Sequence, residues 1–204
     1  YDLKSEPKIQ FEKNDITPEN NQKIKIGIVG AGNFASTTVI PILKELRRSC
    51  QVLGVSSSGG LSSETLAKNF KIKNKYSTEE EIFDSEEIDA VFILTQHFNH
   101  ADLVIKGINS NKAVYVEKPL AIEVDSITKI EEAMYNAEDP KIFLGFNRRF
   151  SEASYFIKEK LNDTPANAIN FRFSVPKLEK DHWTNIKEIG GGRIVGEAIH
   201  AIDL

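Results

Sequence analysis

The stretch IKIGIVGAGNFA, residues 24 to 35, determines the fold class of this 204-residue chain. Residues 24 to 29 are predicted to form a buried strand, and the spacing G-x-G-x-x-A then opens a helix. Gly30 permits a tight turn, Gly32 leaves room for a pyrophosphate beside the backbone, and Ala35 lets the helix pack closely on the strand. The phosphates would then bind at the helix N-terminus.

A glycine loop of this kind also occurs as an ordinary strand-to-helix turn without a ligand. Here residues 37 to 46 supply a helical apolar face, interrupted by Pro41, so the expected strand, turn and helix are all present. The sequence therefore predicts a dinucleotide site, which includes Gly30, Gly32, Asn33, Phe34 and Ala35.

The end of the second predicted strand, residues 51 to 55, bears on the identity of the dinucleotide. NAD-binding units usually carry an Asp or Glu there, which holds the ribose 2′-hydroxyl. This chain continues instead with Ser56, Ser57 and Ser58, whose hydroxyls and backbone N–H groups suit a 2′-phosphate better than a carboxylate would. No arginine follows nearby, so the expected cofactor is NAD or NADP, with NADP slightly favoured.

The composition limits the class of protein. With 40% hydrophobic and 27% charged residues, the chain is an ordinary soluble one of one to two domains. A net charge of −4 with interspersed lysines and acids argues against a nucleic-acid partner. The run of Glu79, Glu80 and Glu81 is interpreted as a solvated helix start. Cys50 is the one cysteine, which excludes a disulfide within the chain and favours a reducing cytoplasm.

The first 23 residues are polar and charged, and they resemble neither a signal peptide nor a membrane anchor. We expect a linker or the end of an upstream module there, and no membrane partner. From residue 24, apolar strands alternate with helical patterns, which is typical of an α/β protein with a parallel sheet covered on both faces. The strands are predicted at 24–29, 51–55, 90–94, 112–116 and 141–145, and the helices between the later strands at 62–70, 78–84, 101–109 and 124–137.

Ligands of such sheets gather at the carboxyl ends of the strands, where Gly30, Ser56, Thr95 and Lys118 all fall. The lysine closes the apolar run AVYVEKP, residues 113 to 119. A nucleotide site combined with one positioned lysine indicates a dehydrogenase.

After Gly145 the pattern changes. A helix is predicted over 152–161 and a strand over 168–175, followed by a polar loop and three glycines at 190–192. One strand and two helices do not form an independent sheet domain. We therefore expect residues 24–146 to form the dinucleotide-binding domain and residues 147–204 to begin an incomplete α+β substrate domain, completed by further strands of a longer polypeptide.

Four segments in this order, GIVGAGNFA, VYVEKPLA, GFNRRF and GGGRIVGEAIHAID, resemble the Gfo/Idh/MocA oxidoreductases, named for glucose-fructose oxidoreductase and inositol dehydrogenase. The resemblance covers residues 24 to 204. It implies a Rossmann doubly wound parallel sheet followed by a substrate domain, whose sheet would also join copies of the chain into a homo-oligomer. GVSSSGGL, KDHW and EIGGGRIVGE further resemble the carboxyl-terminal module of bacterial two-module oxidoreductases that begin with a zinc alcohol dehydrogenase-like unit.

The resemblance implies two catalytic residues. Lys118 matches the lysine of the family's Glu-Lys-Pro motif, which lies beside the nicotinamide and the reacting carbon, and whose bond to proline is often cis. A turn lysine on the surface is the alternative. His200 matches the histidine that exchanges a proton with the substrate alcohol, a task suited to its ordinary pKa. Many members have Asp where this chain has Gly196; the neighbouring Glu197 either replaces that Asp in substrate binding or caps a helix.

Other positions have weaker assignments. Thr95, His97 and Glu117 are expected against the cofactor together with Lys118, Ser56 and Ser57. Asn147, Arg148 and Arg149 would line the route to the substrate, where a guanidinium can hold a carboxylate or sugar oxygen, although surface salt bridges explain them equally well. Trp183 would pack on a sugar ring or simply fill the core. His97 and His100 lie three apart, but no third ligand follows at matching spacing, so no metal is expected.

The sequence thus predicts a nicotinamide-dependent oxidoreductase that acts on a secondary alcohol or ketone of a sugar or polyol. The alternative is a dinucleotide-binding regulatory module of a larger fusion protein that has lost turnover.

Overall fold

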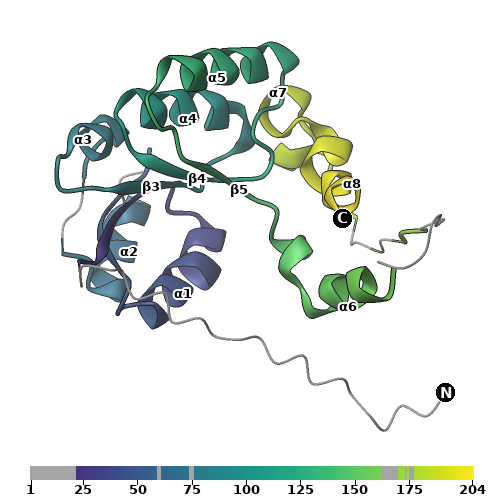
Figure 1. The fold of residues 1–204 in the computed structure, drawn as a ribbon, viewed down its shortest axis with the longest axis horizontal. Helices are drawn as coiled ribbons and strands as arrows, with labels where there is room; N and C mark the ends of the chain where they lie inside the picture. Colours follow the sequence, from purple (N-terminus) through teal and green to yellow (C-terminus); the bar gives the residue numbers. More distant parts are fainter. Residues whose placement is uncertain (1–21, 59–60, 74–75, 162–169, 173, 175–176) are drawn as a thin grey trace, which may run out of the picture.

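The computed structural model describes residues 22–58, 61–73, 76–161, 170–172, 174 and 177–204. Its centre is a parallel five-stranded sheet with strand order β2-β1-β3-β4-β5 (Figure 1). The strands are β1 (Ile24–Val29), β2 (Cys50–Ser56), β3 (Ala90–Ile93), β4 (Ala113–Glu117) and β5 (Ile142–Gly145). All five predicted strands are therefore confirmed, each end to within one residue.

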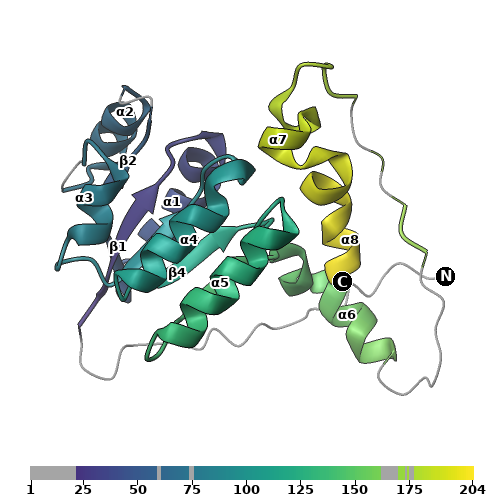
Figure 2. The same cartoon turned by 90° about the horizontal axis from the view of Figure 1, so that it is seen from above.

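Helices cover both faces of this sheet, as Figures 1 and 2 show. On one face lie α1 (Ile40–Glu45) and α2 (Leu61–Phe70), whose apolar residues share a core with Ile28 and Val55 of the sheet. On the other face lie α3 (Glu79–Asp84), α4 (His100–Asn109) and α5 (Val124–Asn136), which pack on Val91 and Val116. Because both faces are covered, β3 and residues 26–29 of β1 are continuous apolar runs.

The helix after the glycine loop has two parts. A wide π-helical turn, η1 (Ala35–Val39), leads directly into α1, and Pro41 lies in the first turn of α1. Proline cannot donate a backbone hydrogen bond, and the helix changes its hydrogen-bond pattern where this donor is missing. The predicted helix over 37–46 is present, and the interruption expected from Pro41 takes the form of this change.

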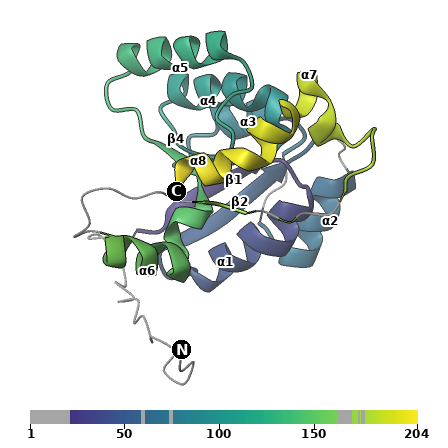
Figure 3. The ribbon, with the colours of Figure 1, turned by 90° about the vertical axis from the view of Figure 1, so that its right-hand side faces the viewer.

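Beyond β5 the chain forms short helical elements at the carboxyl edge of the sheet (Figures 1 and 3). They are η3 (Asn147–Phe150), α6 (Glu152–Leu161), η4 (Trp183–Asn185), α7 (Lys187–Gly190), η5 (Ile194–Ala198) and α8 (Ile199–Asp203). One further short element, η2 (His97–Asn99), lies earlier in the chain, between β3 and α4. Half of the strand predicted over 168–175 lies outside the described residues, and the other half, residues 170–172 and 174, forms no strand. None of the helices in the described part is long and apolar enough to span a membrane.

Candidate active site

The glycine loop joins β1 to η1 with a backbone that only glycine adopts readily. Gly30 has a φ of 106°, and a Cβ atom there would lie 2.5 Å from the carbonyl oxygen of Leu94. Its N–H donates a hydrogen bond to the Ser56 carbonyl at 2.9 Å, which fixes the loop against β2. A Cβ at Gly32, by contrast, would meet nothing within 4 Å. One glycine thus makes the turn, and the other leaves the backbone open to a ligand.

A cavity of about 700 Å³ lies in front of this loop. The loops that follow β1, β2 and β3 form its walls, as expected for a ligand at the carboxyl ends of parallel strands. Of the predicted cofactor residues, the cavity is lined by Gly30, Gly32, Asn33, Phe34, Ser56, Ser57 and Thr95. Ala35 is buried at the helix start behind the loop, where it packs between helix and sheet. Trp183, expected at the substrate, instead lines this cavity from η4.

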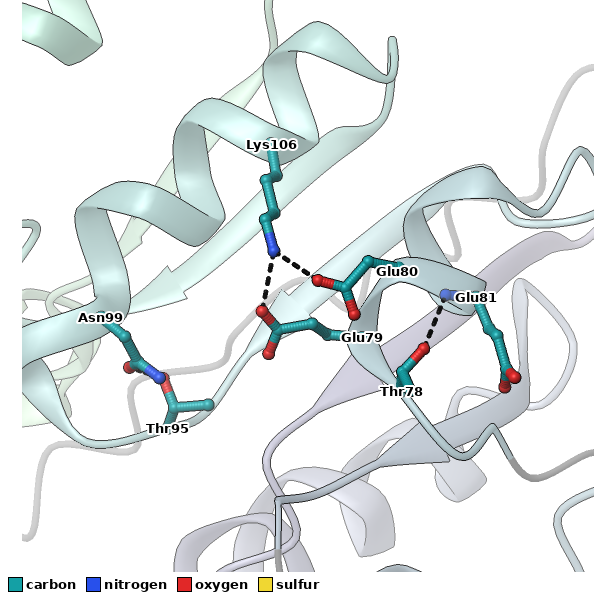
Figure 4. A network of polar contacts seen from close by, with 7 residues as sticks. All are labelled: Thr78, Glu79, Glu80, Glu81, Thr95, Asn99 and Lys106. Atoms are coloured by element: carbon teal, nitrogen blue, oxygen red, sulfur yellow. Dashed lines mark hydrogen bonds and ion pairs between the residues drawn. The ribbon is translucent and has the colours of Figure 1, made fainter.

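The start of α3 supplies a wall that the sequence did not assign. Thr78 caps the helix by accepting a hydrogen bond from the Glu81 N–H at 3.4 Å. Lys106 of α4 donates to Glu79 at 2.9 Å and to Glu80 at 2.8 Å (Figure 4). The prediction that these acids begin a helix is confirmed, but Glu79 and Glu80 also line the cavity. Periodicity alone gave no signal for this, because it depends on where α3 docks.

His100 connects the ends of β3 and β4. It is fully buried, with Nδ1 2.7 Å from the Pro119 carbonyl oxygen and Nε2 3.2 Å from that of Thr95. Burial lowers its pKa, so the ring is held neutral. The Lys118–Pro119 peptide bond beside it is cis, as the resemblance implied. His100 therefore anchors the turn that carries Lys118.

His97 connects the sheet to the later helices. Its Nδ1 lies 2.8 Å from the carbonyl oxygen of Gly190 at the end of α7, and its ring meets that of Trp183 edge-on at 4.7 Å. Burial lowers the pKa of His97 to about 4. Its neighbours Gln96 and Phe98 line the cofactor cavity, whereas His97 points into the protein. The expectation that it touches the cofactor finds no support in this placement.

A second cavity, of about 450 Å³, contains both predicted catalytic residues, Lys118 and His200. Lys118 Nζ donates to the Gly196 carbonyl oxygen at 2.7 Å, which uses one of its three N–H donors. Burial lowers the pKa of Lys118, while the carboxylates of Glu117 and Glu197 oppose the shift. Lys118, at the end of β4, and His200, on α8, thus line the same cavity.

One ring nitrogen of His200, Nδ1, is buried without a hydrogen-bond partner among the described residues. Burial, and then the positive charge of Lys118, lower the pKa of His200. A polar atom of this kind costs free energy unless a ligand or water satisfies it.

The structure gives a reason for glycine at position 196. A Cβ there would lie 2.8 Å from Cγ2 of Thr184, so an aspartate would displace its neighbours. Glu197 lines the second cavity but pairs with Arg193 at 2.6 Å, one turn back on the same helical segment. It lies inside η5 rather than at its N-cap, which is Arg193.

Glu117 lines neither cavity and is instead bonded within its own strand. Tyr115 donates a hydrogen bond to the Glu117 carboxylate at 2.6 Å, and burial raises the pKa of that carboxyl. Gly145 on β5 leaves room for the pair, because a Cβ there would lie 2.7 Å from the Tyr115 hydroxyl. Glu117 therefore contributes charge beside Lys118 rather than a cavity wall.

The structure separates the two arginines of η3. Arg148 lines the second cavity, whereas Arg149 pairs with Asp203 of α8, which is the salt-bridge alternative. Asn147 lines neither cavity. Adjacent arginines in NRRF point in different directions on a tight helix, which the sequence alone does not resolve. No group of three His, Cys, Asp or Glu side chains suited to a metal occurs among the described residues.

Comparison with known proteins agrees with this geometry. Residues 24–143 match the Gfo/Idh/MocA family model, described as an oxidoreductase family with an NAD-binding Rossmann fold. The inositol 2-dehydrogenase/D-chiro-inositol 3-dehydrogenase of Lacticaseibacillus casei is 26% identical over 140 residues, which cover 68% of this chain and 40% of that protein. The trans-1,2-dihydrobenzene-1,2-diol dehydrogenase of Mus musculus is 27% identical, over 83% of this chain and 51% of that protein.

Solved structures share the fold. The myo-inositol dehydrogenase of Lactobacillus casei, in complex with NAD(H) and myo-inositol, superposes with a TM-score of 0.75 at 23% identity, over 89% of this chain and 53% of that one. This chain therefore spans about half the length of such relatives. Because the family model matches more than half of the chain and the glycine-loop cavity lies where that fold binds its dinucleotide, the protein belongs to the Gfo/Idh/MocA oxidoreductase family.

Proposed function

We propose that this protein, as part of its full-length polypeptide, transfers hydride between a nicotinamide dinucleotide and a secondary alcohol or ketone of a sugar or polyol. One observation carries the proposal: Lys118 and His200 line one cavity at the same sheet edge as the glycine-loop cavity. The names of inositol dehydrogenases among the relatives support a polyol as substrate.

The described residues fit a dinucleotide. Gly30 adopts a backbone that needs glycine, the open side of Gly32 admits a pyrophosphate, and the cavity extends from this loop to Ser57 and to Thr95. A bound nicotinamide would supply the hydride acceptor or donor.

Lys118 and His200 would manage the proton. When the alcohol is oxidised, its carbinol carbon loses hydride, that is, the hydrogen together with both electrons of the C–H bond. The hydroxyl proton passes to the imidazole of His200, and a ketone remains. Lys118 has N–H donors beyond the one bonded to Gly196, and these would orient the substrate oxygen. Burial favours the proton-accepting, neutral form of His200 near neutral pH.

Binding and turnover test the proposal separately. NADH or NADPH is titrated into the full-length protein while energy transfer from Trp183, which lines the cofactor cavity, to the reduced nicotinamide is recorded. Myo-inositol and a panel of hexoses then follow with the oxidised cofactors, read as nicotinamide absorbance. We expect binding and a substrate-dependent rate; if neither dinucleotide binds, the proposal is wrong.

The second candidate is a regulatory dinucleotide-binding module without turnover. One observation favours it: Lys118 is bonded to a backbone carbonyl at position 196, where many relatives are expected to offer an acid. Tight cofactor binding without any turnover on the panel would support this candidate.

Four further features stay predictions. Assembly through a carboxyl-terminal sheet is expected from the resemblance, and exposed Ile194 and Ile202 are consistent with a covered surface in the full protein. The two-module arrangement and a reducing cytoplasm rest on the sequence alone. The dinucleotide is NAD or NADP, and the serines after β2 favour NADP.

A further inference from the structure

We propose that Glu79 and Glu80, paired with Lys106, make the adenosine end of the cofactor cavity reject a 2′-phosphate, so that the protein binds NAD(H) in preference to NADP(H). This inference rests on the proposed function, because it concerns the cofactor of that reaction. It also reverses the weak preference that the serine run suggests.

The position of the two acids within the cavity is the first step. Ser56, Ser57 and Ser58 follow β2, and the segment from residue 77 to residue 80 faces the same cavity from the other side. The Tyr76 N–H bonds the Val55 carbonyl at 3.4 Å, which holds this segment beside the end of β2. In this fold the end of the second strand receives the adenosine ribose. Glu79 and Glu80 therefore lie at the ribose end, away from the nicotinamide end.

The charge of this wall is the second step. Lys106 binds both carboxylates, so the three groups together keep one net negative charge (Figure 4). The hydrogen bond from Lys106 lowers the pKa of Glu80, which keeps that carboxyl ionised. Within the part of the chain that the structure describes, no lysine or arginine lines this cavity. A 2′-phosphate would thus meet a net negative charge, because Lys106 offsets only one of the two carboxylates and does not itself line the cavity.

The serines oppose this effect only weakly. Ser56 is buried, with 2% of its surface exposed, so its hydroxyl offers little to a ligand. Ser57 and Ser58 line the cavity, and each hydroxyl would donate one hydrogen bond to a phosphate, but neither brings a positive charge to offset the carboxylates. Repulsion between like charges across a partly solvated cavity acts over a longer range than these bonds. The carboxylates therefore decide the selectivity.

The ion pairs with Lys106 favour one position of the two acids. Lys106 reaches across from α4 and bonds both carboxylates, whose side chains are 35% exposed at Glu79 and 58% exposed at Glu80, so the pairs favour side-chain positions at the rim of the cavity. Glu→Gln changes at these positions keep the size of the side chain and an acceptor for Lys106, and remove the charge alone. Such variants leave the docking of α3 intact.

The test is a titration of the full-length protein with NADH and, separately, with NADPH, in which the ratio of the two dissociation constants is measured. The wild type is expected to bind NADH roughly tenfold more tightly, and E79Q/E80Q should shrink the ratio by about the same factor. The matched control is E131Q at an exposed position of α5, which makes one of the same charge changes at a residue that does not line the cavity. K106Q should increase the preference for NADH, because it removes the cation that offsets one of the two carboxylate charges of Glu79 and Glu80.

The outcomes separate this inference from the proposed function. If both dinucleotides bind but NADPH binds as tightly as NADH, or if E79Q/E80Q leaves the ratio unchanged, the carboxylates do not select the cofactor and the inference is wrong, while the proposed function stands. If neither dinucleotide binds, both fail. A ratio that shrinks in E79Q/E80Q, stays constant in E131Q and narrows with added salt supports the inference.

Discussion

Lys118 is the side chain on which the proposed chemistry depends most. Its ammonium is bonded to Gly196 and faces the cavity that also contains His200. We expect Lys118→Ala to lower turnover by about 10²- to 10⁴-fold, because groups that exchange protons or orient the reacting oxygen supply rates of that order. Dinucleotide affinity should change little, since the lysine lies away from the glycine loop.

Steady-state kinetics with parallel NADH titration check this expectation. Lys129→Ala, at an exposed position on α5, is the matched control and should behave like the wild type. Wild-type turnover in Lys118→Ala would show that the lysine is structural.

His200 should determine the acid side of the pH profile. Its pKa is lowered by burial and by Lys118, so the ring remains a proton acceptor below the ordinary value of 6.5. The rate of alcohol oxidation should therefore fall with a midpoint below pH 6.5 as the ring becomes protonated. His200→Gln should remove this limb and leave a slow, flat profile; an unchanged acid limb in the variant would assign the titration to another group.

At the scale of elements, the two glycines of the β1–η1 loop differ in what they do, and their alanine variants should differ too. Gly30→Ala places a Cβ 2.5 Å from a backbone oxygen at a φ of 106°, so it should lower the free energy of unfolding by about 2 to 4 kcal/mol. Gly32→Ala meets no atom within 4 Å and should cost less than about 0.5 kcal/mol. Its methyl group nevertheless fills the approach of the pyrophosphate.

Urea unfolding and NADH titration of both variants separate stability from binding. We expect Gly32→Ala to fold normally and to lose about tenfold or more in NADH affinity, as removal of a close phosphate approach would cause. Normal affinity in Gly32→Ala would place the pyrophosphate elsewhere.

For the whole molecule, His97 couples stability to pH. The ring joins α7 to the sheet through Gly190, and its pKa is about 4 when folded, against 6.5 when free. Between these values the unfolded chain takes up the proton first, so stability should fall as the pH drops from about 6.5 to 4. The full difference corresponds to roughly 3 kcal/mol.

Chemical denaturation across this pH range measures the effect. Replacing His97 by Gln removes the titrating group, and the variant should lose this part of the pH dependence whatever its stability at pH 7. The same slope in the variant would mean that other groups account for it.

The sequence by itself determined the five strands of the sheet and the type of fold, whereas residues 170–172 and 174 of the strand predicted over 168–175 form no strand. The apolar runs of β1 and β3 and the helical spacing of α4 and α5 are local patterns, set by which faces each element must bury. The strand ends were therefore predicted to within one residue, and the carboxyl edge of the sheet was identified as the place for Gly30 and Lys118.

Only the tertiary structure decided which side chains meet. His97 bonds to a residue 93 positions away and Lys118 to one 78 positions away, contacts that depend on how α7 and η5 dock on the sheet. Docking likewise placed Glu79 in the wall of the cofactor cavity and decided that, of the two adjacent arginines, Arg148 lines the second cavity while Arg149 pairs with Asp203. Periodicity specifies which face of an element is buried, whereas the partners of a polar side chain depend on the position and rotation of elements distant in the sequence.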